Sequence, residues 1–128
     1  MTSTRMNDVA DQLFAAIERG DGPGLAVLWS DDVVVWRQGG GRERDKARGL
    51  KVIEWFVDST TSRRYEVLDR QVFDGGFLQQ HNVHATTRAG DQLTFRACLI
   101  VKVGPDGLIT RIDEYLDPAD LNSLLAES

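Results

Sequence analysis

Apolar positions follow a helical spacing up to about residue 59 and an alternating spacing from about residue 65 onward. In the first stretch, residues 6–19, they recur every three or four positions, as on one face of a helix. Ser3 or Thr4 would cap its start, and Gly20 suits its end because glycine tolerates a left-handed conformation. The apolar stripe consists of Met6, Val9, Leu13 and Ile17, with Ala10 and Phe14 beside it.

Two further helices and one strand are predicted before residue 60. Asp21 and Pro23 are typical of a helix cap and a first-turn proline, which indicates a short helix ending near Trp29. The β-branched run at 31–37 indicates a strand. A helix is predicted over 45–59. Its apolar stripe consists of Ala47, Leu50, Ile53, Phe56 and Val57.

The alternating region predicts four strands joined by short glycine-containing turns. These strands are expected at 65–74, 77–87, 92–103 and 108–116. Asp117 and Pro118 then begin a last helix with Leu121, Leu124 and Leu125 on its apolar side. Helices followed by an antiparallel meander describe an α+β fold with helices on one face of the sheet. With no repeat or linker visible, we expect one domain over residues 1–128.

The strand at 92–103 is apolar on both faces around its centre. One face carries Phe95, Ala97, Leu99 and Val101, and the other carries Cys98 and Ile100. A strand that is apolar on both faces must be covered twice, and the helices cover only one face. We therefore expect a homodimer that forms through the sheet.

Composition and charge indicate which binding partners and which cellular compartment to expect. The net charge of −5 argues against nucleic acid or an anionic membrane as partner. The longest apolar run, 97–101, is too short to cross a bilayer, and residues 1–5 are too polar for a signal peptide. Cys98 is the only cysteine, which is compatible with a reducing compartment. We expect a soluble, cytoplasmic protein.

Two segments of the chain resemble a known family. They are Trp29-Ser30-Asp31-Asp32-Val33-Val34 and the stretch from Asp106-Gly107-Leu108 to Asp117-Pro118. They are similar to the entrance of the first strand and the exit of the last strand in the group that includes SnoaL-like polyketide cyclases, ketosteroid isomerases, limonene epoxide hydrolases and nuclear transport factor 2. The resemblance covers nearly the whole chain. It implies a cone-shaped, cystatin-like α+β fold, with helices on the concave face of a curved antiparallel sheet and one pocket for a small molecule.

The resemblance is specific for the fold and weak for the reaction. The Arg-x-Asp and last-strand Asp of limonene epoxide hydrolases match Asn82, His84 and Glu114, and their first-strand Tyr and Asn match Val35 and Arg37. Because only Glu114 keeps a carboxylate, that mechanism is not expected. The base of ketosteroid isomerases falls at Arg37, whose guanidinium cannot act as a base at neutral pH. A slip of one residue would place Trp36 in the pocket instead of Arg37.

Glu114 and His84 are the two side chains with the clearest potential for proton transfer. Glu114 shares a strand face with Leu108, Ile112 and Leu116, so it is either buried and partnered, lines a cavity, or lies at the rim if the register slips. His84 lies in a polar row with Gln80, Asn82 and Thr86, which is either a hydrophilic pocket wall or a solvated face. The resemblance places that row inside, and an imidazole titrates near neutral pH.

Other constellations give weaker signals. His81 and His84 point to opposite faces of a strand, so no metal site is expected. Residues 37–51 carry four excess positive charges, which either steer an anionic substrate or form an ordinary solvated surface.

These observations lead to two functional hypotheses. The first is a cofactor-independent acid–base enzyme, a cyclase, dehydratase or isomerase, acting on a small and largely apolar substrate. His84 would act as base, Glu114 as its partner or as acid, and Asn82 as the orienting group. The substrate would contact Arg37, Trp36, Phe56, Phe95, Ala97, Leu99 and Ile112. The second hypothesis is a non-catalytic ligand-binding or dimerisation module of the same fold.

Overall fold

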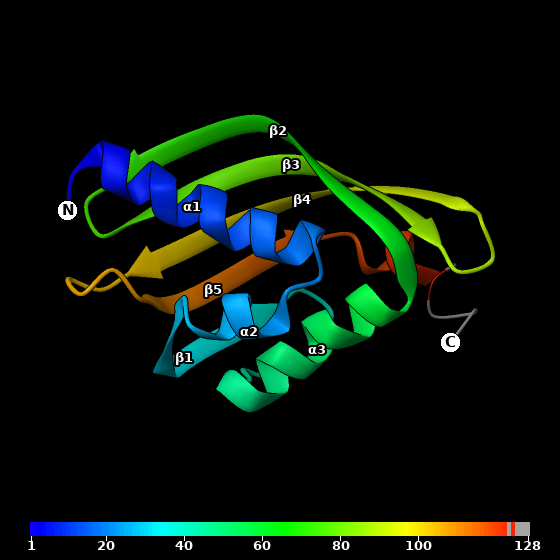
Figure 1. Ribbon diagram of the computed structural model, residues 1–128, viewed down its shortest axis with the longest axis horizontal. Helices are drawn as coiled ribbons and strands as arrows, with labels where there is room; N and C mark the ends of the chain where they lie inside the picture. Colours follow the sequence, from blue (N-terminus) through cyan, green and yellow to red (C-terminus); the bar gives the residue numbers. More distant parts are fainter. Residues whose placement is uncertain (123, 125–128) are drawn as a thin grey trace.

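The computed structural model describes residues 1–122 and residue 124. Its helices are α1 (Ser3–Glu18), α2 (Gly22–Ala26) and α3 (Lys46–Asp58). Its strands are β1 (Trp29–Arg37), β2 (Thr60–Phe73), β3 (Gly76–Thr87), β4 (Gln92–Val103) and β5 (Ile109–Leu116). The 3₁₀ helix η1 (Pro118–Leu121) follows β5. Figure 1 shows their arrangement. The predicted elements are present, with three differences in detail. Trp29 begins β1 and does not end α2, β2 begins five residues before the expected residue 65, and the last helix is a 3₁₀ helix over Pro118–Leu121. Leu125 lies outside the described residues.

The five strands form one sheet in the order β1-β5-β4-β3-β2. The strands β2 to β5 are antiparallel neighbours, as the alternating pattern predicts. The strand β1 lies beside β5 and runs parallel to it, which the sequence did not indicate. Because α3 and three strands separate the two in sequence, no short turn dictates the direction in which they pair. The α+β class with a curved sheet is confirmed.

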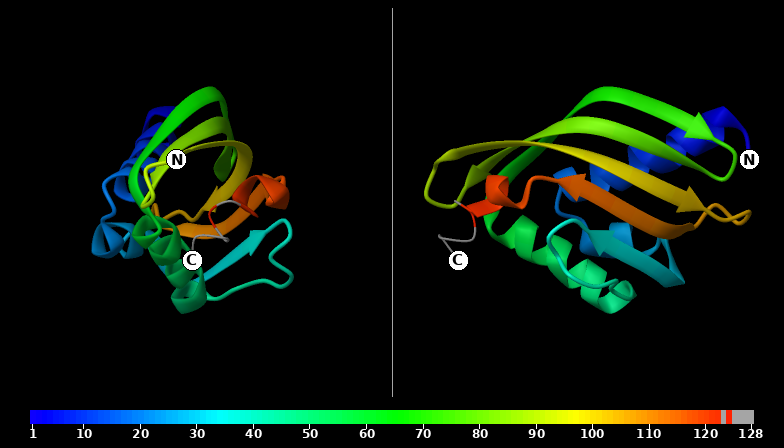
Figure 2. Two further views of the ribbon diagram at one scale, coloured as in Figure 1. Left: turned by 90° about the vertical axis from the view of Figure 1, so that its right-hand side faces the viewer. Right: turned by 180° about the vertical axis from the view of Figure 1, so that it is seen from behind.

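The sheet curves around the helices (Figure 2). The long strand β2 contributes to this curvature, because its register with β3 shifts twice, between Thr60 and Ser62 and between Val67 and Asp69. Such irregularities bend a strand and increase its twist. The helices α1 and α3 lie on the concave side, so the enclosed space is bounded by helices on one side and strands on the other.

The helix starts follow ordinary capping chemistry. Thr2, rather than Ser3 or Thr4, caps α1 by accepting a hydrogen bond from the Arg5 amide at 3.1 Å. Asp21 caps α2 as predicted, accepting from the Gly24 amide at 2.8 Å. None of the described helices is long and apolar enough to span a membrane.

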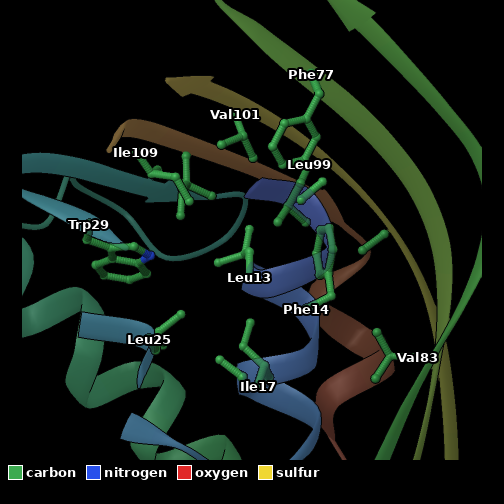
Figure 3. Packing of buried hydrophobic residues seen from close by; sticks show 14 of the residues in the cluster. Leu13, Phe14, Ile17, Leu25, Trp29, Phe77, Val83, Leu99, Val101 and Ile109 are labelled. Atoms are coloured by element: carbon green, nitrogen blue, oxygen red, sulfur yellow. The ribbon is translucent and has the colours of Figure 1, made fainter. Parts of the chain in front are cut away.

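The hydrophobic core fills the space between α1 and the concave face of the sheet. Figure 3 shows how Leu13 and Phe14 of α1 meet inward-facing strand residues such as Phe77 and Leu99. The helix α3 packs less tightly, since Gly49 is its only buried residue and its apolar side chains are half-buried. Ala47, which was expected on the buried stripe of α3, is exposed.

Candidate functional site

A cavity of about 100 Å³ lies between α1, α3 and the concave face of the sheet. Its wall is mostly apolar. Of the residues predicted to contact a substrate or carry chemistry, the cavity is lined by Arg37, Phe56, Phe95, Leu99, Ile112 and Glu114. The half-buried side chains of α3 belong to this wall, which explains why that helix packs loosely against the sheet.

Arg37 and Glu114 face the cavity from adjacent strands. They are register partners in the parallel pairing of β1 with β5, and Glu114 is in turn paired with Leu99 of β4. Cross-strand partners share a face of the sheet, so the three side chains form one row across the concave side. The alternative that Trp36 faces the pocket is thereby resolved in favour of Arg37.

The environment of Glu114 favours the protonated form of its carboxyl group more strongly than aqueous solution would. Burial raises the pKa of Glu114, because a charged carboxylate loses hydration among apolar side chains. The positive charge of Arg37 acts in the opposite direction and lowers it. No residue that the structure describes forms a hydrogen bond or ion pair with the Glu114 carboxyl group. Its oxygens are therefore available to a ligand.

Tyr65 of β2 adds a hydroxyl group to the same cavity. Burial raises the pKa of Tyr65, and the negative charge of Glu114 raises it further, which keeps the phenol protonated at neutral pH. The backbone of Tyr65 is fixed to α1, because its amide donates to Glu18 Oε2 at 2.9 Å. Tyr65 is thus a positioned hydrogen-bond donor close enough to Glu114 to be influenced by its charge.

Asn82 and His84 lie on the outer, convex face of the sheet. His84 Nε2 is 2.8 Å from Glu66 Oε1 and its Nδ1 is 3.2 Å from Thr94 Oγ1, while Asn82 donates to Glu66 at 3.3 Å. The prediction that these two residues share a cavity with Glu114 is therefore wrong. The side chains of a strand alternate, so a match displaced by one residue reverses every orientation.

Two further predicted contact residues are also placed elsewhere. Trp36 lies on the outer face, where its ring centroid is 5.2 Å from that of Tyr115. This follows from the alternation that turns Arg37 inward. Ala97 faces inward and is buried, but it belongs to the packed core and not to the cavity wall.

His81, rather than His84, is the inward-facing histidine of β3. It is fully buried, and its Nδ1 is 3.0 Å from Gln79 Nε2, whose own Oε1 accepts from Arg70 Nε at 2.8 Å. Gln79 therefore donates to Nδ1, which leaves the proton of the neutral ring on Nε2. Burial lowers the pKa of His81 from 6.5 to about 4. His81 is a neutral core residue at physiological pH.

Several residues that line the cavity were not predicted as site residues. They include Trp29, Val35, Arg44, Trp55 and Tyr65. Val35 is two positions before the inward-facing Arg37 and therefore shares its face of the strand. The alternation of side chains would have identified Val35 once Arg37 was placed. Tyr65 and the two tryptophans carry no comparable signal, because their contribution depends on how far the sheet curves.

A second cavity, of about 470 Å³, lies between α1, α2 and α3. It shares Ile17 and Ile53 with the first one, and three carboxylates, Asp21, Glu54 and Asp58, lie along it. It is larger, but Glu114 and Tyr65, whose pKa values are raised by burial, line only the first cavity. The first cavity is therefore the candidate site. No group of three or more potential metal ligands occurs in the part of the chain that the structure describes.

Comparisons with known proteins agree with this architecture. The chain is similar to the solved structure of AclR from Streptomyces galilaeus, with a TM-score of 0.84, 17% sequence identity and 98% of each chain covered. It is also similar to the structure of PrhC from Penicillium brasilianum, with a TM-score of 0.86, 15% identity, and 99% of this chain and 89% of the other covered. An LEH-like epoxide hydrolase from M. tuberculosis is also similar (0.77, 18%, 96% and 90%). At these identities the likeness concerns the fold.

No curated protein sequence matches the chain significantly. The sequence model of the SnoaL-like domain, however, matches residues 10–112, a range that includes β1 with Arg37 and the first half of β5 but ends before Glu114. The chain therefore belongs to the SnoaL-like domain family.

Proposed function

We propose that the cavity binds a small, largely apolar organic molecule with a carbonyl oxygen, and that Glu114 transfers a proton on it. The observation that carries this proposal is the environment of Glu114. Its carboxyl group has no hydrogen-bond partner among the described residues, lies in an apolar wall, and has a raised pKa. A carboxyl group with a pKa moved toward neutrality is suited to both accepting and donating a proton.

The chemistry follows from the groups around it. The Glu114 carboxylate takes a proton from the carbon next to the carbonyl, so that a C–H bond breaks and an O–H bond forms on Glu114. The electron pair moves onto the carbonyl oxygen, which becomes an enolate. The guanidinium of Arg37 and the hydroxyl of Tyr65 supply positive charge and a hydrogen bond to that oxygen. Where a C=C bond adjoins the carbon that lost the proton, the enolate is a dienolate, and return of the proton from Glu114 to its far carbon shifts the double bond. This completes an isomerisation, and no step requires a cofactor.

Non-catalytic binding is the second candidate function. It is favoured by the placement of His84 and Asn82 on the outer face, which removes two of the three predicted catalytic groups from the cavity. The inward residues of β3 at this level are His81 and Val83, and His81 is neutral and packed. Glu114 is then the single proton-transfer group on which catalysis depends.

Exchange of carbon-bound hydrogen distinguishes the two functions. With 1-tetralone, an apolar ketone, in D₂O, loss of the proton signal next to the carbonyl measures proton abstraction by NMR. We expect exchange above the buffer rate, its loss in Glu114→Gln, and retained binding in that variant. Glu66→Gln, which removes a carboxylate from the outer face, is the matched control. Binding with exchange at the buffer rate would support the non-catalytic module.

We also propose that two copies pair through the outer face of the sheet. Cys98 and Ile100 are half-buried there, and Tyr115 beside Trp36 is 44% exposed. A surface of this kind on the central strands is typical of an interface.

A cytoplasmic location, with no nucleic acid or membrane as partner, remains part of the proposal because of the acidic net charge and the single cysteine.

A further inference from the structure

Trp29 has a polar atom that the protein does not satisfy. The residue is 1% exposed, lines the cavity, and has no hydrogen-bond partner for its Nε1 among the described residues. Figure 3 shows the nitrogen on the edge of the ring that faces Leu13, which also lines the cavity. Burying an unpaired N–H is costly, so native proteins seldom leave one without a reason.

The ring of Trp29 is held in this orientation by its surroundings. A Cβ at position 49 would lie 3.1 Å from Trp29 Cζ3 and 3.0 Å from Val35 Cγ2, so only glycine lets α3 approach the ring this closely. The backbone is fixed as well, because Lys46 Nζ donates to the Trp29 carbonyl at 2.9 Å. A glycine inside a helix costs about 1 kcal/mol relative to alanine. The chain therefore keeps an unfavourable residue where it sets the position of the indole.

The other unpaired buried nitrogen, His81 Nε2, differs in its surroundings. The His81 ring packs edge-on against Phe14 and Tyr65, with centroids 5.3 and 4.8 Å away. His81 does not line the cavity, whereas Trp29 does.

From these observations we infer that the Trp29 indole N–H binds a second oxygen of the ligand, at the end of the cavity away from Glu114. This inference rests on the proposed function. Trp29 pairs with Ile109 and Arg37 with Glu114, five positions further along β5, so the two polar contacts approach the shared cavity from different ends. The indole only donates, so the ligand must offer an acceptor there. The ligand class is thus an elongated, apolar ring system with an oxygen function toward each end. Because Nε1 is covered and faces Leu13, the side chain of Leu13 must shift when the acceptor binds.

A matched pair of ketones tests the inference. In 6-methoxy-1-tetralone the ring bears an ether oxygen opposite the carbonyl, and in 6-ethyl-1-tetralone a methylene group replaces that oxygen. We expect the methoxy compound to bind about fivefold more tightly, the usual effect of one hydrogen bond. In Trp29→Phe the two compounds should bind equally. In Trp36→Phe, the control on the outer face, the fivefold preference should remain.

The indole proton of Trp29 in the unmodified protein gives an independent readout that does not depend on folding of the variant. Its NMR resonance should move downfield with the methoxy compound and not with the ethyl compound. Equal affinities together with an unmoved resonance would overturn the role of Trp29 and leave the proposed function standing. Failure of both ketones to bind would overturn both proposals.

Discussion

Arg37 and Glu114 are register partners on adjacent parallel strands, and both side chains line the same cavity. They form no ion pair within hydrogen-bond distance, yet the charge of Arg37 lowers the pKa of Glu114 while burial raises it. The carboxyl group is thus held between a desolvating wall and a cation. These opposing influences act on one carboxyl group, and a raised pKa moves it toward the range that suits a group that gives and takes a proton.

Removal of the Glu114 charge should change how stability depends on pH. Because the folded-state pKa is above the unfolded value, the folded protein binds the proton more tightly, and stability falls as pH rises from about 4.5 through the folded pKa. Glu114→Gln should remove this loss. We expect the melting temperature of the variant to rise relative to the unmodified protein as pH increases above 4.5. A difference that is constant with pH would contradict the raised pKa.

Arg37→Met should raise the pKa of Glu114 further, because it removes the cation that favours the charged form. Titration of ¹³C-labelled glutamate by NMR measures the change directly. Arg44→Met is the matched control, since Arg44 also lines the cavity but its guanidinium contacts the Gly40 carbonyl, at 3.4 Å. The argument for coupling between Arg37 and Glu114 fails if both variants shift the pKa equally.

The sequence predicts most of the fold because its signals are local. Periodicity located each helix and strand, and Asp21 and Pro23 marked the start of α2 correctly. The parallel pairing of β1 with β5 depends on contacts far apart in sequence, which periodicity does not report.

The orientation of β3 shows where the site prediction failed. Phe77, Val83 and Ala85 make the odd-numbered positions the more apolar set, and they do face inward. The family alignment instead favoured the even positions Asn82 and His84, and a displacement of one residue exchanged the two faces. On β5 the apolar neighbours of Glu114 left a buried, a cavity-lining and a rim position open, and the structure places the residue in the cavity wall.

Ile100→Asp should convert a dimer into a monomer. The substitution places an unpaired charge at the centre of the outer face, where it would be costly to bury against a second copy. Sedimentation at micromolar concentration should give twice the chain mass for the unmodified protein and the single chain mass for the variant. Val27→Asp, at a residue 70% exposed after α2, should leave the mass unchanged. A monomeric unmodified protein would exclude the interface.

Gly49→Ala should not stabilise the protein, although alanine is the better helix former by about 1 kcal/mol. The added methyl group would crowd both Trp29 and Val35, and one of them must move by a few tenths of an ångström. We expect a melting temperature that is unchanged or lower, together with a shifted Trp29 indole resonance. Gly22→Ala, which has no neighbouring atom within 4 Å, is the control and should be neutral or slightly stabilising. A clear rise in melting temperature for Gly49→Ala would show that the ring is not held by this contact.

His81 should remain neutral in the folded protein down to about pH 4, because burial lowers its pKa to about that value. In the unfolded chain it takes up a proton near pH 6.5, so the unfolded state binds more protons between these limits. Stability should therefore fall as pH decreases from 6.5 to 4, by roughly 3 kcal/mol in all from this residue. The His81→Gln variant has no group that titrates at this position, so it should lose less stability over the same pH range. The control is His84→Gln, which removes an imidazole from the outer face of the sheet. NMR titration of the two rings provides the direct measurement. A His81 resonance that titrates near pH 6.5 would mean that water reaches the ring, and the description of His81 as a neutral core residue would be wrong.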